Sequence, residues 1–502
     1  MNKTYDNRHL DIYWLIGILL ISIAIGFSLR SIPGYTGIAS HDSSMFQYFG
    51  RLMNHGYVPY VDMFDHKGPL LFFINALGHV SFHGIEFLWF IETISIFVTL
   101  MFTYLSARFF VHSGVAGVAV LITSVIYVNT LAGGNYSEEY ALPLISISLF
   151  FLGRFFIKKD FRIYIPFLFG LTGVLVIFLR ANMIILWVIG TCAVIGYLIV
   201  SKNNEVLWKM ILYAALGAIL AAVPFFIYCL MTNSLSQMIY QAFKFNVLYV
   251  KYTSGVGLNN VLSFFAKLFI DHGWMLIIIG QPWVFFEVWQ NREKNSKWYL
   301  ASVYSYGLLN IISVLLSQRE YPHYLLTEIP FLIIIVALLI SEIFNLSRNK
   351  RLLTFASIIL VTVLMAVPSL KLLGQTYTQK NVPFYWTRDT QLVANYIKQN
   401  TSSKDTIYVH EKDANIYNIA KRKSNSRFFT LPAVNLDKFP RLKKEFIQGL
   451  SKRKPVFIVT WAGFLKQKQY KVGTSQYELQ RIIMHKYKNT YNDYFYNVYK
   501  LK

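Results

Sequence analysis

A polar loop between residues 40 and 73 carries a dense set of side chains that could do chemistry. It reads SHDSSMFQYFGRLMNHGYVPYVDMFDHKGPLLFF and holds three Asp, three His, one Lys and one Arg. A carboxylate in such a loop could remove the proton of an acceptor hydroxyl, and a cation could neutralise a departing phosphate. Asp42 is our candidate general base, and Lys67 is our candidate phosphate contact. Together they supply the parts for glycosyl transfer from a phosphate-linked donor.

Three further segments are dense in ionisable residues and supply the remaining candidates. They are LAGGNYSEEY (131–140), LRAN (179–182) and SQREYPHY (317–324). In the last segment, Arg319 is a second candidate phosphate contact. The other candidates are two carboxylates that would assist the base and a set that would line the substrate cavity: Glu138 and Glu139, and Asp62, Asp65, His66, Tyr321, His323 and Tyr324.

Each group of candidates also has a plainer structural explanation. Asp42, with Ser40, could cap a helix that begins near Ser43. The charged residues at 62–67 could form surface salt bridges. The adjacent glutamates at 138–139 could begin a helix, because the helix dipole favours carboxylates there.

Two charged residues in or beside apolar runs are interpreted separately. Glu92 lies inside a predicted membrane span, where an ionisable side chain is rare and is usually paired. Arg180 lies at the end of a predicted span and is interpreted as an interfacial residue.

The elements that must position these side chains are transmembrane helices. The chain is 55% hydrophobic and 17% aromatic with a mean hydropathy of +0.42, which is too apolar for a soluble protein of 502 residues. Windows of about 20 apolar residues, enough to span a bilayer core, predict about eleven spans: 11–29, 86–107, 114–131, 140–157, 162–179, 183–200, 209–230, 273–289, 299–316, 325–343 and 352–373. The two cysteines, Cys192 and Cys229, fall inside predicted spans, so no disulfide framework is expected.

Basic residues mark every second connection between the predicted spans. They precede the first span and recur near 108, 154–162, 202–209, 292–297 and 348–351. Because cytoplasmic loops are enriched in Lys and Arg, this pattern predicts a cytoplasmic N-terminus and, with an odd number of spans, an extracytoplasmic C-terminus. The first span lacks a small-residue cleavage site and is predicted to be a retained helix. All four polar segments then face the outside of a plasma membrane, where a lipid-linked donor is expected.

A change in composition near residue 375 divides the chain into two predicted domains. Residues 1–374 form a transmembrane domain with a large first outer loop at 30–85. Residues 375–502 alternate helices with short strands (TIYVH, KPVFIVTWAG and YFYNVYKL), which predicts a small extracytoplasmic α/β domain. This domain has 24 Lys and Arg against 8 Asp and Glu, a net of +16 out of the chain's +23. Its basic surface either serves solubility or indicates anionic neighbours, such as lipid headgroups, phosphorylated carriers or a phosphate-rich wall polymer; nucleic acid is not expected there.

The motifs occur in an order that resembles a known enzyme family. An Asp follows the first span, Lys67-Gly68-Pro69-Leu70 comes later in the same loop, an acidic residue follows the third span, and a His-Tyr pair precedes a late span. This order resembles the GT-C superfamily of glycosyltransferases, in particular the bacterial branch of protein O-mannosyltransferases and lipid A aminoarabinose transferases. The family has a Lys-Pro-Pro-Leu-like motif, and here Gly68 replaces its first Pro.

The resemblance implies a polytopic membrane enzyme of the GT-C type that moves a sugar, with inversion, from a polyprenyl-phosphate carrier to an acceptor on the outer face. It implies that Asp42 is, or lies next to, the catalytic base and that Lys67 contacts the donor phosphate. The acceptor could be a cell-wall polymer such as teichoic acid, a polysaccharide, a lipid or a protein. A divalent metal ion at Asp42, Asp62 or Asp65 stays open, because some GT-C enzymes need one and others do not; His66 is interpreted as a polar loop residue.

The alternative functions are a flippase for lipid-linked sugars and a polymerase or ligase of surface polysaccharide. Transporters usually place ionisable residues near the membrane midplane within repeated, interrupted helices. No clear repeat relates the two halves of this chain, and its charged groups cluster in loops. A polymerase or ligase would share the location but usually lacks the first-loop motif, so the glycosyltransferase is the favoured hypothesis.

Overall fold

The computed structural model describes most of the chain, in two compact units. The described residues are 8–35, 37–80, 85–252, 257–271, 274, 282, 285–286, 289–290, 294–317, 319–345, 385–410, 414–429, 435–466 and 470–502. One unit, the helical unit, comprises Met1–Ile32, Trp89–Ile227 and Gly255–Thr378. The other, the mixed unit, comprises Pro33–Leu88, Tyr228–Ser254 and Gln379–Lys502.

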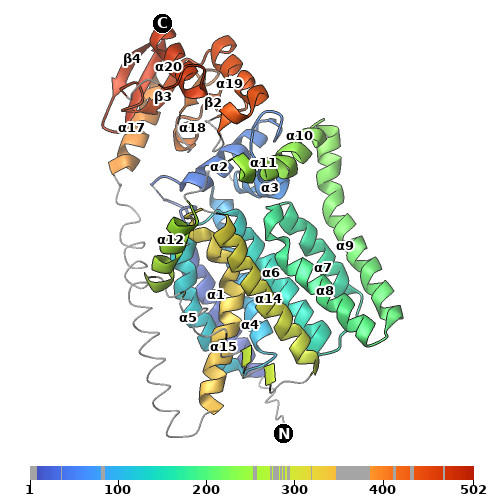
Figure 1. Ribbon diagram of the computed structural model, residues 1–502. Helices are drawn as coiled ribbons and strands as arrows, with labels where there is room; N and C mark the ends of the chain where they lie inside the picture. The colour runs from blue at the N-terminus through green and yellow to red at the C-terminus, as the bar shows by residue number, and fades with distance from the viewer. Residues whose placement is uncertain are drawn as a thin grey trace. The chain divides into compact units, whose positions relative to one another are not determined.

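The helical unit is a bundle of long apolar helices (Figure 1). Its elements are α1 (Arg8–Gly26), α4 (Glu86–Ala107), α5 (Ser113–Leu131), α6 (Ser137–Ile157), α7 (Tyr164–Ile177), η1 (Ala181–Ile184), α8 (Ile185–Val200), α9 (Asn204–Met231), α12 (Leu258–Asp271), α14 (Lys294–Leu316), η3 (Pro322–Glu328) and α15 (Ile329–Asn345). Among the described residues, seven helical segments are long and apolar enough to cross a membrane. The chain is therefore a multi-pass membrane protein.

Seven of the predicted spans are confirmed as long apolar helices. The predicted spans 11–29 and 162–179 correspond to shorter apolar helices, α1 and α7. The predicted spans 273–289 and 352–373 lie mostly or wholly outside the described residues. The total of eleven spans and their orientation in the membrane stay predictions.

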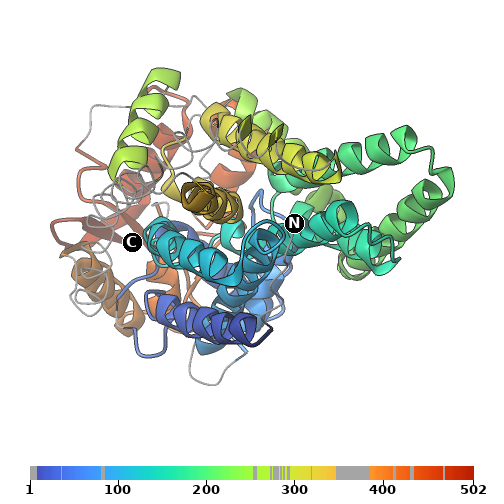
Figure 2. The same ribbon diagram turned by 90° about the horizontal axis from the view of Figure 1, so that it is seen from below.

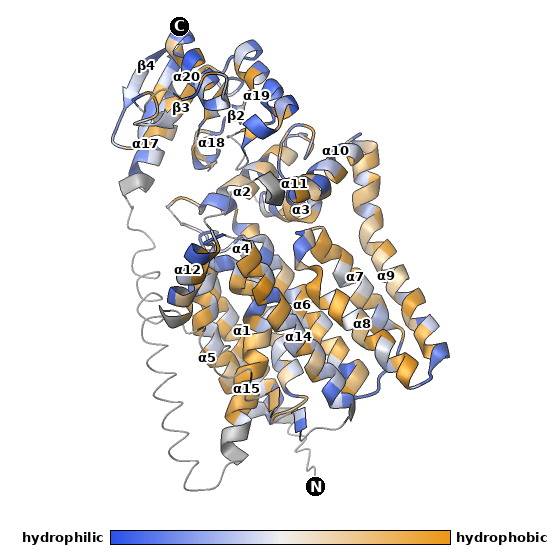
Figure 3. Cartoon of the chain, viewed as in Figure 1, coloured by the Kyte–Doolittle hydropathy of each residue, from blue (hydrophilic) through white to orange (hydrophobic). Residues whose placement is uncertain are grey.

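Three helices extend to one side of the helical unit. Viewed along the bundle, α7, α8 and α9 (teal to green) project outward (Figure 2), with α7 packed against α6 and α8 against α14. Glycines let α7 and α9 approach closely, because a Cβ at Gly170 or Gly217 would lie 1.9 Å from a backbone oxygen of the facing helix. Only 17% of the most apolar stretch of α9 is buried within the protein. All three helices are hydrophobic along their length (Figure 3). Such close glycine contacts and apolar outer surfaces are typical of helices that face lipid.

In the mixed unit, the polar first loop folds as two short helices joined by the segment PYVDMFDHKGP. The helices are α2 (His41–Met53) and α3 (Pro69–Gly78). Pro69 suits the first position of α3, where no backbone N–H is needed. At Gly50 of α2, a Cβ would lie 2.4 Å from the carbonyl group of Asn75, so only glycine allows this approach to α3. A further helical stretch of the mixed unit comprises α10 (Leu235–Ile239), a π-helical turn (Tyr240–Lys244) and α11 (Phe245–Tyr252).

The C-terminal part of the mixed unit is a five-stranded mixed sheet with helices (Figure 1). Its elements are α17 (Tyr385–Gln399), β1 (Thr406–Val409), α18 (Asn415–Ala420), β2 (Lys423–Ser424), η4 (Leu436–Lys438), α19 (Pro440–Lys452), β3 (Phe457–Trp461), α20 (Ser475–Lys486), β4 (Tyr487–Asn492) and β5 (Tyr496–Leu501). The strand order is β2-β1-β3-β5-β4, in which β1 runs parallel to β2 and β3 while β5 runs antiparallel to β3 and β4. Its hydrophobic core includes Ile458 and Leu479 and also Phe64 from the first loop.

The three predicted strands are confirmed as β1, β3 and β5. The sequence does not predict β2, which is two residues long, or β4, whose sequence YKNTYN is polar. β4 lies at the edge of the sheet and is largely exposed, so it shows no apolar pattern. Asp413, expected to cap the helix now seen as α18, lies outside the described residues.

Acidification is expected to weaken the mixed unit through His410. Its ring is buried, with Nε2 2.8 Å from the Gln476 Oε1 atom and Nδ1 3.2 Å from the Tyr408 hydroxyl oxygen. Burial lowers the pKa of His410 from 6.5 to about 4. Between these two values the unfolded chain binds the proton and the folded unit does not. The free energy of unfolding should therefore fall as the pH falls from about 6.5 to 4, by about 2 kcal/mol at pH 5.

Thermal unfolding of the purified full-length protein at pH 7 and pH 5 measures this effect. A His410→Gln variant should lose clearly less stability on acidification than the unmodified protein. His485→Gln, which changes an exposed histidine of the same unit, should keep the original pH dependence. Equal losses in the unmodified protein and in His410→Gln would contradict the role given to His410.

Candidate active site

Four connections of the helical unit meet at one end of its bundle. They follow α1, α5, α7 and α14. The Arg30 N–H donates to the Gly133 carbonyl oxygen at 2.9 Å, and the Ser31 hydroxyl donates to Glu92. Arg180, which follows α7, contacts Glu138 at the start of α6 and Tyr324 in η3. The candidate segments of this unit, 131–140, 179–182 and 319–324, therefore share one end of the bundle, and the face of the membrane that this end meets stays a prediction.

Basic connections of the helical unit hold their own carboxylates. Arg108, after α4, bonds Asp11 at 2.7 Å, and Arg154 and Arg162 each lie 2.6 Å from the Asp160 carboxylate. The hydrogen bond from Arg162 lowers the pKa of Asp160. Among them, the Arg162 side chain is 61% exposed, so its ion pair is a surface counterpart to the more deeply buried pair described next.

Glu138 and Arg180 form a buried ion pair in the helical unit. Glu138 is the second residue of α6, and Arg180 lies between α7 and η1. The Arg180 guanidinium donates to the Glu138 carboxylate and, at 2.8 Å, to the Tyr324 hydroxyl oxygen. With Asn310 and Thr327, these three residues line a small polar cavity. A charged group bound there would interact more strongly than at the protein surface, because the cavity is shielded from water.

Glu139 has a different environment from its neighbour Glu138. Its carboxylate accepts the backbone N–H of Asn135 at 2.7 Å and that of Tyr136, the N-cap residue of α6, at 3.4 Å, the second of which belongs to a capping box. The carboxylates of Glu139 and Glu92 converge on Gly134, whose φ is +81°. A Cβ at Gly134 would lie 2.4 Å from Glu92 Oε1 and 3.4 Å from Glu139 Oε2. Glu139 therefore serves the N-terminus of α6 and lies beside Glu92, while Glu138 pairs with Arg180.

The segment 319–324 adds an aromatic stack to the same end of the helical unit. The His323 ring stacks on Tyr136 with centroids 4.2 Å apart and planes 9° apart. Tyr321 also stacks on His323, with ring centroids 5.5 Å apart, and is itself exposed. Arg319 is half-buried at the start of this segment. Thus Tyr324 contacts Arg180 directly, and His323 lies in the stack with Tyr136.

Asp65 and Lys67 are both buried in the mixed unit, each with 8% of its surface exposed. The Asp65 carboxylate accepts the Lys67 backbone N–H at 2.8 Å, and Lys67 Nζ lies 3.4 Å from His66 Nε2. Burial raises the pKa of Asp65, the Lys67 ammonium lowers it, and the charge of Asp42 raises it again. The turn thus presents the Lys67 ammonium and the Asp65 carboxylate together, and the charge of Asp42 from α2 acts on them, which suits a phosphate near a proton acceptor.

Asp42 does not cap a helix. α2 begins at His41, so Asp42 lies inside the first turn and the cap position belongs to Ser40, which makes no capping hydrogen bond with its side chain. The Asp42 carboxylate lies 3.0 Å from His41 Nδ1, and 30% of its side chain is exposed. Asp42 is therefore more accessible than Asp65 to a substrate that enters from solvent.

Asp62 differs from Asp42 and Asp65 in its contacts. Its carboxylate accepts the Val58 N–H at 2.8 Å and closes a turn at the surface. Its side chain also lines a large cavity of the mixed unit. The surface salt-bridge cluster considered for 62–67 is contradicted for Asp65 and Lys67, since both are buried.

Several residues that hold this site are not predicted by the sequence. Gln241, in the π-helical turn, donates to the Tyr60 carbonyl oxygen at 2.7 Å and accepts the Asp65 N–H at 3.2 Å. Asn246 donates to the His66 carbonyl oxygen at 2.9 Å. Arg180 pairs with Glu138 and is partly buried, with 18% of its side chain exposed, while its interpretation as an interfacial residue stays a prediction. π turns occur often at functional sites, but no sequence pattern marks this one.

Within the described ranges, no three His, Cys, Asp or Glu side chains are placed so that they could hold a metal ion. The metal question at Asp42, Asp62 and Asp65 therefore stays open for experiment.

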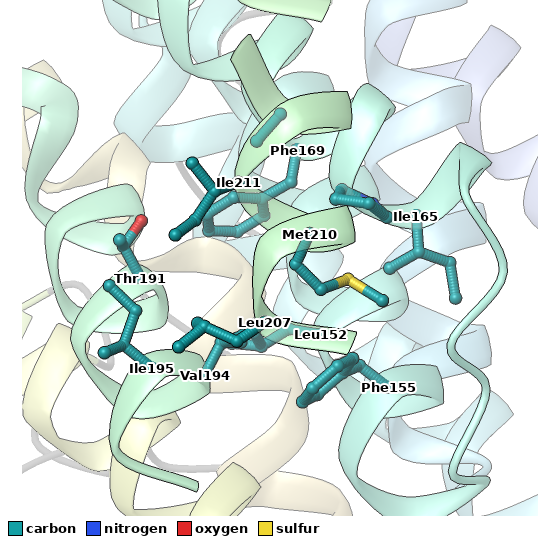
Figure 4. A pocket seen from close by; sticks show the side chains of 12 residues that line it. Leu152, Phe155, Ile165, Phe169, Thr191, Val194, Ile195, Leu207, Met210 and Ile211 are labelled. Carbon is teal, nitrogen blue, oxygen red and sulfur yellow. The ribbon is translucent and has the colours of Figure 1, made fainter. Parts of the chain in front are cut away.

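An apolar pocket of the helical unit lies far along α6 from Glu138 (Figure 4). Phe155, Phe169 and Met210 are among its lining residues, and Thr191 supplies its one side-chain hydroxyl. Phe155 follows Glu138 by 17 residues of α6, which is roughly 25 Å at the rise of an α-helix. With this lining the pocket suits a hydrocarbon chain and not group transfer.

Comparisons with known proteins identify relatives of both parts of the chain. Residues 4–352 match the family model described as "Putative competence-induced protein Ccs4 N-terminal domain". Residues 387–502 match the one described as "Putative competence-induced protein Ccs4 C-terminal domain". No curated protein matches the sequence.

Solved structures share the fold at low sequence identity. Two crystal structures of ArnT from Cupriavidus metallidurans, one in the apo state and one bound to undecaprenyl phosphate, each match with a TM-score of 0.63 and 12% identity. Both matches cover 97% of this chain, and they cover 98% and 97% of ArnT respectively. The oligosaccharyltransferase of Archaeoglobus fulgidus, in complex with Zn and sulfate, matches with a TM-score of 0.55 and 13% identity over 90% of this chain and 68% of its own. The resemblance to the GT-C superfamily is thereby confirmed at the level of the fold.

Proposed function

Because this chain belongs to the Ccs4 family and has the fold of ArnT, we propose that it is a membrane glycosyltransferase. Its donor is a sugar linked to a polyprenyl phosphate, and its acceptor carries a hydroxyl group on the outer face of the membrane. The undecaprenyl phosphate bound to ArnT supports this choice of carrier.

The observation that carries the proposal is that Asp42, in the first turn of α2, acts electrostatically on the buried turn that holds Asp65 and Lys67. A buried ammonium in the same region as a carboxylate that solvent can reach is what transfer from a phosphate-linked donor requires. A flippase has no need of a proton acceptor beside a phosphate contact.

In the proposed reaction, the acceptor oxygen forms a bond to the anomeric carbon while the bond from that carbon to the phosphate oxygen breaks. The hydroxyl proton passes to Asp42. The electron pair leaves with the polyprenyl phosphate, whose growing charge is stabilised by Lys67. Attack opposite the leaving group inverts the anomeric carbon. Asp65 fixes the backbone of Lys67 through its 2.8 Å hydrogen bond.

The helical unit holds a group of candidate residues of its own. Glu138 holds Arg180, and Arg180 in turn contacts Tyr324, so these three form one polar group that can bind a charged or hydroxylated part of a substrate. Arg319 is retained as a phosphate contact, and Tyr321 and His323 as wall residues. Glu139 is a positioning residue, because its carboxylate caps α6.

A donor panel tests the proposed function. The purified full-length protein in nanodiscs is incubated with polyprenyl-phosphate-linked hexoses, pentoses and aminosugars, and mass spectrometry records the released polyprenyl phosphate and the glycosylated acceptor. Consumption of one donor class is the expected result. Movement of lipid-linked sugar across a liposome bilayer without consumption of any donor would instead establish the flippase. Wall polymers of a deletion strain, analysed for a missing sugar, then identify the product.

Lys67→Ala is expected to raise the KM for the lipid-linked donor by about 10- to 100-fold, because a charge-assisted hydrogen bond is lost. Steady-state kinetics over a range of donor concentrations measures this change. Lys67→Arg keeps the charge and should recover part of the loss. Lys244→Ala, an exposed lysine of the same unit, should leave the KM unchanged. An unchanged KM in Lys67→Ala would exclude Lys67 as the phosphate contact.

A further inference from the structure

A large polar cavity of the mixed unit takes no part in the chemistry described so far. Its volume is about 770 Å³, which is within the range of ligand sites. One side is formed by the first loop, from Tyr48 to Asp62, and the other by β2, the turn after it and the C-terminal end of α19. Five basic residues line it against two acidic ones, namely Lys423, Arg427, Lys452, Arg453 and Lys454 against Asp62 and Glu445.

Most of the positive charge in this cavity is available to a ligand. Arg427 is already paired with Glu445 through hydrogen bonds of 2.6 and 2.7 Å. By contrast, Lys452, Arg453 and Lys454 are exposed, and in the described part of the chain no carboxylate lies within ion-pair distance of them. Lys423 donates to the Tyr57 hydroxyl and lies 5.1 Å from the centre of its ring. Four of the five basic side chains of the cavity, Lys423 and those at 452–454, thus make no ion pair with the described residues, and this excess of positive charge attracts a polyanion.

The basic residues at the end of α19 belong to a segment that hydrogen bonds hold in place. The Asn425 side chain donates to the carbonyl oxygens of Gly449 at 2.8 Å and of Arg453 at 3.0 Å, and so joins the turn after β2 to the end of α19. Cations at the end of α19 also complement its helix dipole. Lys423 belongs to the neighbouring strand, however, and extends the basic surface beyond the helix end.

The opposite wall is suited to hydroxylated groups. Tyr57 is half-buried and can place its ring against the face of a sugar or polyol, and the exposed Asp62 carboxylate can accept a hydroxyl. Aliphatic lining is limited to Leu52 and Val61. A lipid, which brings one phosphate and long acyl chains, would find few apolar contacts here.

From this arrangement we propose that the cavity binds the acceptor of the transferase, and that this acceptor is a polymer of phosphodiester-linked, hydroxyl-bearing units. The inference rests on the proposed function and adds to it the chemical class of the acceptor. Repeated phosphates would contact Lys423 and the cations at 452–454, and hydroxylated units would contact Tyr57 and Asp62. Asp62 lies three residues before Asp65 in the same turn-forming segment, so a polymer in the cavity would pass beside the residues proposed for transfer.

Binding is tested without any donor, so its outcome is separate from that of the transfer assay. The probe is a poly(glycerol phosphate) of defined length, titrated against the full-length protein in nanodiscs of neutral lipid at several salt concentrations. The cavity variant replaces Lys452, Arg453 and Lys454 with Gln. The control variant replaces Lys398, Lys404 and Lys488 with Gln, which removes the same charge from exposed positions of the same unit outside the cavity. Hyaluronan, single-stranded DNA and phosphatidylglycerol vesicles serve as comparison ligands.

We expect the cavity variant to bind the probe about tenfold more weakly, because each exposed charge pair contributes modestly, and the control variant to bind within twofold of the unmodified protein. Equal losses in the two variants would reduce the effect to general electrostatic attraction and overturn the proposal. If the cavity variant lost more affinity for the vesicles than for the polymer, the cavity would be assigned to lipid and the proposal would be overturned. A preference for single-stranded DNA or for hyaluronan would equally overturn a phosphodiester glycopolymer as the ligand.

Discussion

Replacing Asp42 with asparagine is expected to lower the turnover of the lipid-linked donor by about 100- to 10,000-fold, the usual contribution of a general base. The amide keeps the size of the side chain but cannot take up the hydroxyl proton. Because 30% of the Asp42 side chain is exposed and it caps no helix, the substitution should leave the folding of α2 intact. Single-turnover kinetics with donor and acceptor in excess of their KM values measures the change.

The other two aspartates of the loop provide matched controls for Asp42. Asp62→Asn changes a carboxylate that lines the proposed acceptor cavity, so its main effect should be a higher KM for the acceptor, while the rate at saturating acceptor stays within a few-fold of normal. Asp65→Asn keeps an oxygen that can accept the Lys67 N–H, so its main effect should be on donor binding. If Asp65→Asn abolishes turnover while Asp42→Asn retains it, the base is Asp65 and our assignment is wrong.

Arg180→Ala is expected to lower the free energy of unfolding by about 3–5 kcal/mol, because it leaves the Glu138 carboxylate buried without its partner. The side chains of this pair are 18% and 5% exposed. The midpoint of denaturant-induced unfolding of the purified protein in detergent micelles measures the loss. The Tyr324 hydroxyl also loses its guanidinium contact, which should add to the effect.

Two further variants distinguish the cost of leaving a buried charge without its partner from the cost of removing any arginine. Arg162→Ala breaks an ion pair whose arginine is 61% exposed, and it should lower the free energy of unfolding clearly less than Arg180→Ala does. A double variant, Glu138→Leu with Arg180→Met, removes both buried charges and should be more stable than Arg180→Ala alone. Equal destabilisation by Arg180→Ala and Arg162→Ala would show that burial does not increase the contribution of the Glu138–Arg180 pair to the free energy of unfolding.

The membrane helices could be predicted because an apolar run of about 20 residues has few alternatives to a helix in a bilayer. Strands β1, β3 and β5 could be predicted because they are short apolar runs between helices. β4 could not, because an exposed edge strand satisfies its backbone by pairing with β5 and needs no apolar side chains. Local sequence pattern thus reveals what is buried and leaves out what is held by pairing alone.

The residues of the candidate site likewise divide into those that the sequence could predict and those that it could not. Residue type and spacing identify Asp42, Lys67 and Glu138, since each could do chemistry wherever it lies. The residues that pair with or hold the site could not be predicted in this way. Arg180 pairs with a residue 42 positions earlier, and Gln241 bonds a carbonyl oxygen 181 positions earlier. Such contacts depend on how the helices pack. A single polar residue at the end of an apolar span has the same sequence appearance whether it is buried or interfacial.

The shared core of the mixed unit has a consequence for biogenesis. Phe64 packs with residues of the C-terminal sheet, and its N–H donates to the Arg427 carbonyl oxygen at 3.0 Å. The Tyr48 hydroxyl likewise accepts the Ser424 N–H at 2.9 Å. At a synthesis rate of 5–20 residues per second, the first loop emerges about 20 to 80 seconds before these partners exist. During that interval the nascent loop exposes apolar and reactive groups, so folding of the proposed catalytic turn is one of the last events after translation, and an incomplete chain cannot form it.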